Sequence, residues 1–363
     1  MDIAFHATPT PFRSHDCPPR LEDSPVLSHD IVYRSTSDDL QEGLGVLIEP
    51  ILRDRGEDII VRWLTGLGHC TLLLGVAFVA PGWSQADELA QRQTTASAIA
   101  TEGQTTERNW HAFWRYHLGT WQGSWTRYAA SGDVKETFTS TRQFTANEAK
   151  TDIVQVNRYR YADGRAIEKK WSYNVKDHNR RDGFAHPASV AMRGLALDNG
   201  AAAWLIPSLQ PNQVAPFELF LIDGDIRHSV GVLYGKNGNL IRTATIREQR
   251  GNPPNIGWTH AIRQVEPWHP DGRWEGQGRQ IHQDLSHVPV QHTAWQWMDT
   301  LQSNHFFPDH IILRCPQRII PGQAFSLQVI WMLKNNELQT ITAKYDNNAQ
   351  LVAIAHQALA PEG

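Results

Sequence analysis

The stretch of sequence that decides the fold is Leu118-Gly119-Thr120-Trp121-Gln122-Gly123-Ser124-Trp125. Its Gly-x-Trp-x-Gly pattern returns as Gly272-Arg273-Trp274-Glu275-Gly276. Glycine lets the chain enter a tight bend, and a large aromatic ring can close one end of a small β-barrel. A pattern that recurs at the spacing of a whole domain indicates a tandem repeat. We therefore predict two β-barrels, in which Trp121 and Trp274 have structural roles.

Tight-turn signals follow the first motif at regular intervals. They are Ser131-Gly132, Asp163-Gly164, Asn199-Gly200, Asp223-Gly224 and Asn237-Gly238. Asn-Gly and Asp-Gly favour two-residue hairpins because both central residues need positive φ. About eight or nine strand-like runs lie between Gly119 and Glu248. An antiparallel meander of that size closes into a barrel wide enough for one small ligand. The predicted fold class is all-β, with a first up-and-down barrel over residues 108–250.

The second predicted barrel covers residues 258–363, after a boundary at Pro253-Pro254. Its strand-like runs are Arg273–His282, Val290–Met298, His310–Cys315, Phe325–Leu333, Leu338–Tyr345 and Gln350–His356. Six strands are few for a closed barrel. We therefore expect this barrel to be incomplete, or to depend on the first one for closure.

The N-terminal third has a different character. Residues 1–60 show no sustained period and are predicted to be poorly structured, or to precede the true translation start. Residues 61–86 contain an apolar run, Leu72–Ala80, that is followed by Ser84-Gln85-Ala86. This pattern is typical of a secretory signal, and the run is too short to span a membrane comfortably. The alternative is a buried or interfacial helix. The protein is accordingly expected in the cytoplasm, or in the periplasm or outside the cell if this segment is a signal peptide.

Two features lead into the first barrel. Residues 87–107 are rich in Gln, Thr, Ala and Ser and are predicted to be a linker. Between Arg108 and His117, aromatic residues recur at helical spacing. They predict a short helix that covers the mouth or the base of the barrel.

Composition excludes several classes of function. The net charge is −4, which gives no electrostatic case for binding nucleic acid or an anionic membrane. Cys17, Cys70 and Cys315 form no Cys-x-x-Cys pair, and His282, His287 and His292 recur at a spacing that matches neither a strand nor a helix face. We therefore expect no metal. Glycine-rich nucleotide motifs and Gly-x-Ser-x-Gly are absent from the sequence, so we expect no cofactor and no serine hydrolase.

The run from His117 to Tyr128 resembles the opening of a mainly cyanobacterial family of unknown function with a calycin-type, lipocalin-like fold. The resemblance extends through Ala162-Asp163-Gly164, His186-Pro187-Ala188-Ser189, Arg227-His228-Ser229-Val230 and Ile246-Arg247-Glu248, and covers about residues 108–360. Calycin relatives include bilin lyases and lipid carriers, so the resemblance implies a bound hydrophobic or pigment-like molecule. It also implies that an arginine of the last strand, here Arg247, packs on Trp121 as a cation–π pair. A looser resemblance is to the cyclase of the scytonemin pathway, which acts on an aromatic β-keto acid.

The candidate catalytic residues lie on one predicted hairpin. Glu218 shares a strand face with Phe220 and Ile222, and an inward carboxylate among apolar residues has a raised pKa that suits acid–base chemistry. On the next strand Arg227 and His228 point to opposite faces, so one of them faces inward. A buried arginine suits a substrate carboxylate, and a buried histidine suits proton transfer. The alternatives are a Glu on the outer face, an Arg in a surface ion pair and a His satisfied by backbone.

A second group of residues is expected to line the ligand site. His186 follows the polar loop of residues 176–183 and lies at a strand entrance, near the predicted barrel mouth. Arg193 and Trp204 are on the following strands, and Tyr234 shares the face of His228. An ordinary loop histidine is the alternative for His186.

Three functions are compatible with these features. The first is binding of a small hydrophobic or aromatic molecule in the first barrel. The second is a cofactor-independent enzyme, such as a cyclase that removes CO₂ from a β-keto acid, in which Glu218 and His228 move protons and Arg227 holds a carboxylate. The third is a structural or assembly factor whose barrel is filled by side chains. The volume of free space inside the first barrel separates the third from the other two, and the sequence does not define the oligomeric state.

Overall fold

The computed structural model describes residues 103–253, 255–298 and 302–363, which all belong to one compact unit. The expectations for residues 1–60 and 61–86, and for most of the predicted linker, lie outside the described residues. The predicted helix is present but longer, because residues 103–107 of the linker are also helical and the helix runs over residues 103–117. Within the described ranges, no helix has both the length and the apolar character that a membrane span needs.

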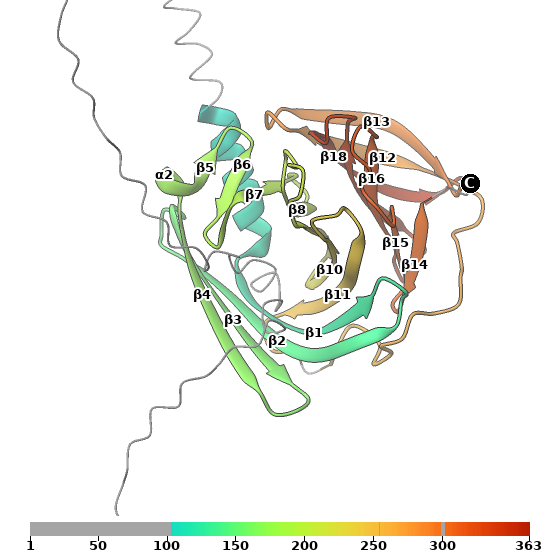
Figure 1. Ribbon diagram of the computed structural model, residues 1–363, viewed down its shortest axis with the longest axis horizontal. Coiled ribbons are helices and arrows are strands. Elements are labelled where there is room, and N and C mark those ends of the chain that lie inside the picture. Colours follow the sequence, from blue (N-terminus) through green and yellow to red (C-terminus); the bar gives the residue numbers. More distant parts are fainter. Residues whose placement is uncertain (1–102, 254, 299–301) are drawn as a thin grey trace, which may run out of the picture. The chain divides into compact units, whose positions relative to one another are not determined.

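Eleven strands form an antiparallel sheet that curls into a nearly closed barrel (Figure 1). They are β1 (Gly119–Ala129), β2 (Val134–Ala146), β3 (Asp152–Tyr161), β4 (Ala166–Asn174), β5 (Asn179–Arg180), β6 (Gly183–His186), β7 (Ser189–Ala196), β8 (Ala202–Leu205), β9 (Ala215–Asp223), β10 (Ile226–Tyr234) and β11 (Leu240–Arg250). Strands adjacent in sequence pair with each other, except β4 and β5, which are the two edges of the sheet. Because β1 also pairs with β11, the up-and-down meander is confirmed. The predicted strand number was too low, partly because the short β5 lies within the expected polar loop of residues 176–183 and β6 begins at the end of that loop. The short helix α2 (Val175–His178) contacts both β4 and β6.

The five predicted turns are confirmed by their backbone geometry. Their glycines have φ values from 56° to 95°, a region that favours glycine; they are Gly132, Gly164, Gly200, Gly224 and Gly238. These turns make hairpin connections short, and this is why the first sheet could be predicted as an antiparallel meander.

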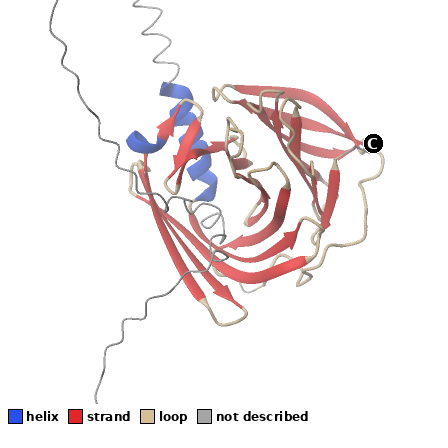
Figure 2. Cartoon of the chain, in the orientation of Figure 1, coloured by secondary structure: helices blue, strands red, loops and turns tan. Residues whose placement is uncertain are grey.

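The second sheet has seven antiparallel strands and is open. They are β12 (Arg273–His282), β13 (His287–Gln296), β14 (Ser303–Phe307), β15 (Ile311–Cys315), β16 (Phe325–Met332), β17 (Leu338–Tyr345) and β18 (Leu351–Pro361). Their order is β13-β12-β18-β17-β16-β15-β14, so β13 and β14 are the two edges. An incomplete second barrel is therefore confirmed, with β14 as the strand that the sequence did not predict. Figure 2 shows that strands dominate both parts of the described chain.

The protein has two main hydrophobic cores, and β9 and β10 contribute to both because these strands are buried on both faces. One set of their residues, including Phe220, faces the barrel interior. The other set, including Leu219 and Val230, packs against Val329 and Ile341 of the second sheet. Cross-contacts fix this packing: the Tyr234 hydroxyl donates to the Pro316 carbonyl at 2.8 Å, and the Tyr345 hydroxyl donates to the Ile206 carbonyl at 2.9 Å. The second sheet thus uses the outer wall of the first barrel to bury its own apolar face.

The Gly-x-Trp-x-Gly motifs lie at the starts of β1 and β12. Trp121 is fully buried in the barrel interior, and its indole N–H donates to the His117 carbonyl at 3.0 Å. Trp274 is buried in a small apolar cluster of the second sheet. The glycine after each Trp is required by close packing, since a Cβ at Gly276 would lie 2.1 Å from the Ala358 carbonyl oxygen.

The expected pairing of Arg247 with Trp121 is wrong. The guanidinium carbons of Arg227 and Arg250 lie 4.1 Å and 4.6 Å from the Trp121 ring centroid. Side chains alternate along β11, and Arg250 is the residue opposite Trp121 while Arg247 is opposite Ser124. Arg247 therefore points out of the barrel, where it has a different set of contacts.

Candidate functional site

Four buried charged side chains meet inside the first barrel. Arg142 of β2 donates to both carboxylate oxygens of Glu248 of β11, and its second amino nitrogen donates to Glu218 of β9 at 3.3 Å. Arg227 of β10 donates through Nε to Glu248 at 2.8 Å. Two arginines and two glutamates give a cluster of zero net charge, which is the condition for keeping charges in a buried site.

The surroundings shift the pKa values of the two carboxyl groups, Glu218 and Glu248, in opposite directions. Burial raises the pKa of Glu218, although Arg142 and the hydroxyl of Ser229, which donates to its Oε1 at 2.6 Å, oppose the shift. Burial also acts to raise the pKa of Glu248, but Arg142 and Arg227 together outweigh it and lower that pKa. Burial lowers the pKa of Arg227 to about 10. The surroundings therefore favour the charged form of Glu248 and, relative to an ordinary glutamate, the neutral form of Glu218.

His117 at the end of the 103–117 helix completes the cluster. Its Nδ1 accepts from Arg227 at 2.9 Å, so its proton lies on Nε2. Burial, followed by the charges of Arg227 and Arg142, holds the His117 pKa well below its ordinary value, and the ring is neutral. Within the described chain, neither His117 Nε2 nor Glu218 Oε2 has a hydrogen-bond partner.

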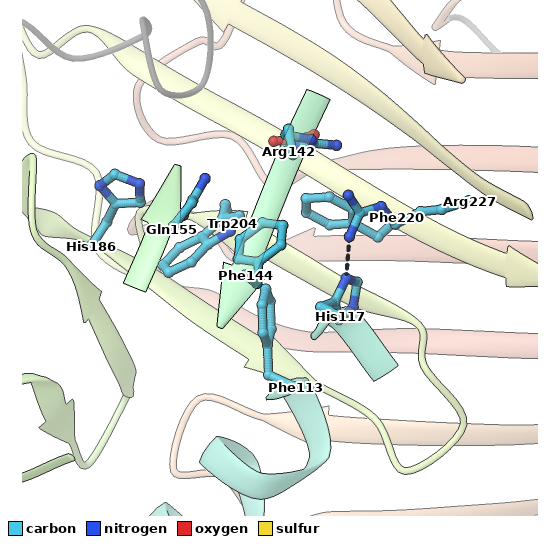
Figure 3. Close-up of a pocket in the computed structure, with 10 residues that line it drawn as sticks. Phe113, His117, Arg142, Phe144, Gln155, His186, Trp204, Phe220 and Arg227 are labelled. Atoms are coloured by element: carbon cyan, nitrogen blue, oxygen red, sulfur yellow. Dashed lines mark hydrogen bonds and ion pairs between the residues drawn. The ribbon is translucent and has the colours of Figure 1, made fainter. Parts of the chain in front are cut away.

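The cavity beside these groups is very small. Figure 3 shows the aromatic rings of Phe113, Phe144, Trp204 and Phe220 around it, together with His117, Arg142 and Arg227. Its volume is about 10 Å³, which is room for about one water molecule. A substrate or a pigment does not fit.

The helix of residues 103–117 is what fills the barrel. Trp110, Phe113 and Trp114 are fully or almost fully buried, at the i, i+3, i+4 spacing of one helix face. Phe113 stacks on His117 with ring centroids 4.3 Å apart and meets Trp204 edge-on at 5.5 Å. The helix therefore acts as a plug of the barrel interior.

The structure brings only some of the predicted site residues together. Glu218, Arg227, His186 and Trp204 all line the small cavity. His186 is buried there, and burial lowers its pKa to about 3. Its position is therefore that of a neutral interior histidine.

The other predicted residues lie elsewhere. His228 is on the opposite face of β10, where its ring centroid is 4.5 Å from that of Trp331 in the second sheet. Tyr234 is on the same outer face. Arg193 donates to Asp182 at 2.6 Å and does not line the cavity. Glu218 and His228 therefore cannot act on one substrate, which removes the predicted proton-transfer pair.

Three residues of the cluster were missed in the sequence: His117, Arg142 and Glu248. Arg142 shares the buried face of β2 with Phe138, Ser140 and Phe144. A charged residue in this otherwise uncharged row is the sequence signal that could have identified it. Glu248 lies opposite Gly123 across the β1–β11 pair, which closes the barrel. The two strands are far apart in the sequence, so no local pattern indicates this contact.

A much larger pocket lies on the outer wall of the barrel, under residues 255–262, which we call the strap. This strap pocket has a volume of about 640 Å³. Its floor comes from β1, β2, β3 and β11 and its cover comes from the strap and Pro253; the lining residues include Gln122, Ser124, Thr139, Thr141, Arg158, Arg160, Arg247, Ile256, Trp258, Thr259, His260 and Ile262.

Arg247 anchors the strap. Its Nη1 donates to the carbonyls of Thr259 at 3.1 Å and Ala261 at 2.9 Å, and to Asp309 at 2.9 Å. Further along, the Tyr128 hydroxyl donates to the Ile262 carbonyl at 2.8 Å, and Gln249 accepts from the backbone N–H of Gly257 at 3.0 Å. The strap is thus fixed to the barrel wall along its length, and the pocket beneath it is preformed.

A third cavity, of about 420 Å³, lies in the second sheet. Half of the residues that line it have amide or hydroxyl side chains, and the rest include Arg279, Arg314 and Lys344. Some of the polar side chains bond to one another: Gln328 donates to Thr342 at 3.1 Å, and Gln302 donates to Ser326 at 3.2 Å. Groups of three or more metal-binding side chains are absent from the described parts of both sheets.

Residues 106–253 match a family model described as a domain of unknown function (DUF3598), N-terminal. This match spans the whole of the first sheet. A solved structure of a DUF3598-family protein of unknown function from Nostoc punctiforme PCC 73102 is similar to the chain with a TM-score of 0.54 and 14% identity. The match covers 70% of this chain and 99% of that one, and it shows a shared fold. The predicted resemblance to a family of unknown function is thus confirmed for the first sheet.

A more distant match is the S-type phycobiliprotein lyase CpeS from Guillardia theta. It has a TM-score of 0.29 and 11% identity, and covers 42% of this chain and 98% of that one. No curated protein matches the chain.

Proposed function

We propose that the protein binds a small hydrophobic or aromatic molecule and that the molecule lies in the strap pocket, outside the first barrel. The observation that carries this proposal is the contrast in volume between about 640 Å³ under the strap and about 10 Å³ inside the barrel. Ligand sites in proteins commonly have volumes of about 300–1,000 Å³. The strap pocket is within this range.

The strap supplies the apolar surface for such a ligand. Ile256 and Ile262 line the pocket but remain 52% and 38% exposed, although large aliphatic side chains are usually buried. Trp258 lies between them in sequence and lines the same pocket. A bound apolar group would remove these side chains from water, at a gain of roughly 25 cal/mol for each Å² buried.

Catalysis by the barrel interior is not part of this proposal. Glu218 and Arg227 do lie on one cavity, as a cyclase acting on a β-keto acid would require, but the cavity has no room for such a substrate. His228 lies on the other side of the sheet. The interior cluster is better explained as a buried support of the fold. The barrel is filled by side chains, as in our third expectation, and its interior does not provide the ligand site that we expected there.

The cellular location of this binding function follows from residues 61–86, which are outside the described chain. The protein acts in the cytoplasm, or outside it if that segment is a signal peptide. An N-terminus after Ala86 in protein from its natural source supports export, and an uncleaved segment contradicts it.

The binding proposal is tested with N-phenyl-1-naphthylamine, a neutral aromatic dye that becomes fluorescent in apolar surroundings. We expect saturable binding by the full-length protein and, for Ile256→Ser, an affinity lower by about fivefold, since the lost transfer free energy is about 1 kcal/mol. The matched control is Ile320→Ser, because Ile320 is 45% exposed and lies outside the pocket. Equal binding by both variants and the wild type contradicts the proposed site, and absence of saturable binding contradicts the function.

A further inference from the structure

We infer that the ligand of the strap pocket is an amphiphile with an anionic group, and that this group is held on the floor of the pocket by arginines. The inference rests on the proposed function and adds the chemical class of the ligand. It comes from the way in which cross-strand pairing arranges the floor.

The polar floor consists of two rows that cross the sheet. In the first row, Arg247 of β11 is opposite Ser124 of β1, Ser124 is opposite Thr139 of β2, and Thr139 is opposite Arg160 of β3. Side chains of directly opposed residues lie close together on one face of a sheet. An arginine therefore lies at each end of a short row of two hydroxyl groups.

The second row is its neighbour. Gln122 of β1 is opposite Thr141 of β2, and Thr141 is opposite Arg158 of β3. Because residues two apart on a strand share a face, Arg158 and Arg160 project from the same side of β3. The floor thus combines guanidinium groups with hydroxyl and amide groups, all of which can donate to an anion.

Carboxylates are absent from the lining of the strap pocket in the described structure. Arg158 is paired at 2.7 Å with Glu168 on β4, and Arg247 is paired at 2.9 Å with Asp309. Arg160 has no ion-pair partner among the described residues. The pocket therefore has an uncompensated positive charge at one end of its floor.

Arg247 gives independent support at the other end. Its side chain is only 2% exposed and lines the pocket, and its Nε has no hydrogen-bond partner within the described chain. Unsatisfied donors are costly in buried positions, and more so when the donor is charged. An anionic group at this end of the floor would satisfy this donor.

Two dyes with the same aromatic skeleton test the inference. 1-Anilinonaphthalene-8-sulfonate carries one sulfonate, and N-phenyl-1-naphthylamine lacks it. For the full-length protein at low ionic strength, we expect the sulfonate dye to bind about tenfold more tightly than the neutral dye, because it adds a charge-assisted contact. Raising the NaCl concentration from about 20 mM to about 500 mM is expected to weaken binding of the sulfonate dye only.

The variant for this test is Arg160→Gln, which leaves the strap anchor Arg247 intact. We expect it to reduce affinity for the sulfonate dye by about fivefold and to leave the neutral dye within about twofold, since only one dye has a charge to lose. The control is Arg273→Gln, at an arginine that is 54% exposed and outside the pocket. Equal affinity for the two dyes, or an equal loss of both in Arg160→Gln, overturns the anionic inference and leaves the proposed function standing. If neither dye binds, the proposed function itself fails.

Discussion

The side chain of Glu248 occupies the space in which a side chain at residue 123 would lie. A Cβ built on Gly123 would be 2.5 Å from Glu248 Cγ and 2.5 Å from the Arg247 carbonyl oxygen. The second glycine of the Gly-x-Trp-x-Gly motif thus makes room for the buried anion that Arg142 and Arg227 share. The motif that opens the barrel is in this way tied to the charged cluster inside it.

The first prediction follows directly from this contact. Gly123→Ala is expected to destabilise the protein by about 2–3 kcal/mol, because the added methyl group forces Glu248 and the β11 backbone to move. Urea denaturation followed by tryptophan fluorescence measures the effect. Gly103→Ala is the control, since a Cβ at Gly103 would meet no atom within 4 Å. A free energy of unfolding unchanged in Gly123→Ala contradicts this explanation of the motif.

Removing the buried carboxylate of Glu248 is expected to lower the free energy of unfolding more than removing an exposed carboxylate. Glu248→Gln leaves Arg142 and Arg227 without their shared carboxylate, and we expect a loss of about 3–5 kcal/mol in the free energy of unfolding. Glu168→Gln is the matched control, because Glu168 is 56% exposed and pairs with Arg158 at 2.7 Å. Its expected loss is below about 1 kcal/mol. Similar losses in the two variants would show that the interior cluster is not a buried ion pair.

The plug role of the helix predicts a large effect at Phe113. Phe113→Ala should destabilise the protein by about 3–5 kcal/mol, because it removes a buried ring from the centre of the barrel. His111→Ala changes the exposed face of the same helix and is expected to alter stability by less than about 0.5 kcal/mol. Denaturation midpoints of the two variants and the wild type decide the matter. An effect at Phe113 no larger than that at His111 contradicts the plug.

The buried position of His228 leads us to expect a specific pH dependence of the free energy of unfolding. Burial lowers its pKa from 6.5 to about 4, so the folded state takes up this proton less readily than the unfolded state. A group with a depressed pKa contributes stability that is present above pH 6.5 and is lost as the pH falls toward 4, here up to about 3 kcal/mol. His228→Phe keeps a ring against Trp331 and removes this titration.

We therefore expect His228→Phe to unfold with nearly the wild-type free energy at pH 7.5 and to lose less stability than the wild type between pH 6.5 and pH 4. Denaturation at a series of pH values measures both quantities. An unchanged pH profile would mean that His228 does not remain neutral in the folded protein.

Much of the fold could be predicted because local signals were strong. Turn glycines such as Gly164 and Gly238 defined the hairpins, and strand alternation correctly separated Arg227 from His228. Alternation could not decide which of the two faces lines the barrel, because both faces of β9 and β10 are buried. The second sheet covers one of them, and no local pattern in the sequence carries that information.

The site was harder to predict than the fold. Arg142 and Glu248 meet only because β1 closes the barrel by pairing with both β2 and β11, a contact between distant parts of the chain. The same register places Arg247 outside the barrel, which the resemblance to calycins did not anticipate. The sequence around Pro253 indicates only a boundary between two domains. In the structure, the strap that follows it covers the largest of the three pockets described above.

A crystal structure of the protein with bound 1-anilinonaphthalene-8-sulfonate would show directly whether the ligand binds in the strap pocket or inside the first barrel. We expect electron density for the dye between Trp258 and the floor of the strap pocket, with the sulfonate beside Arg160 or Arg247 and the 103–117 helix still inside the barrel. Density for the dye inside the first barrel, next to Glu218 and Arg227 and with Phe113 displaced, would contradict this expectation.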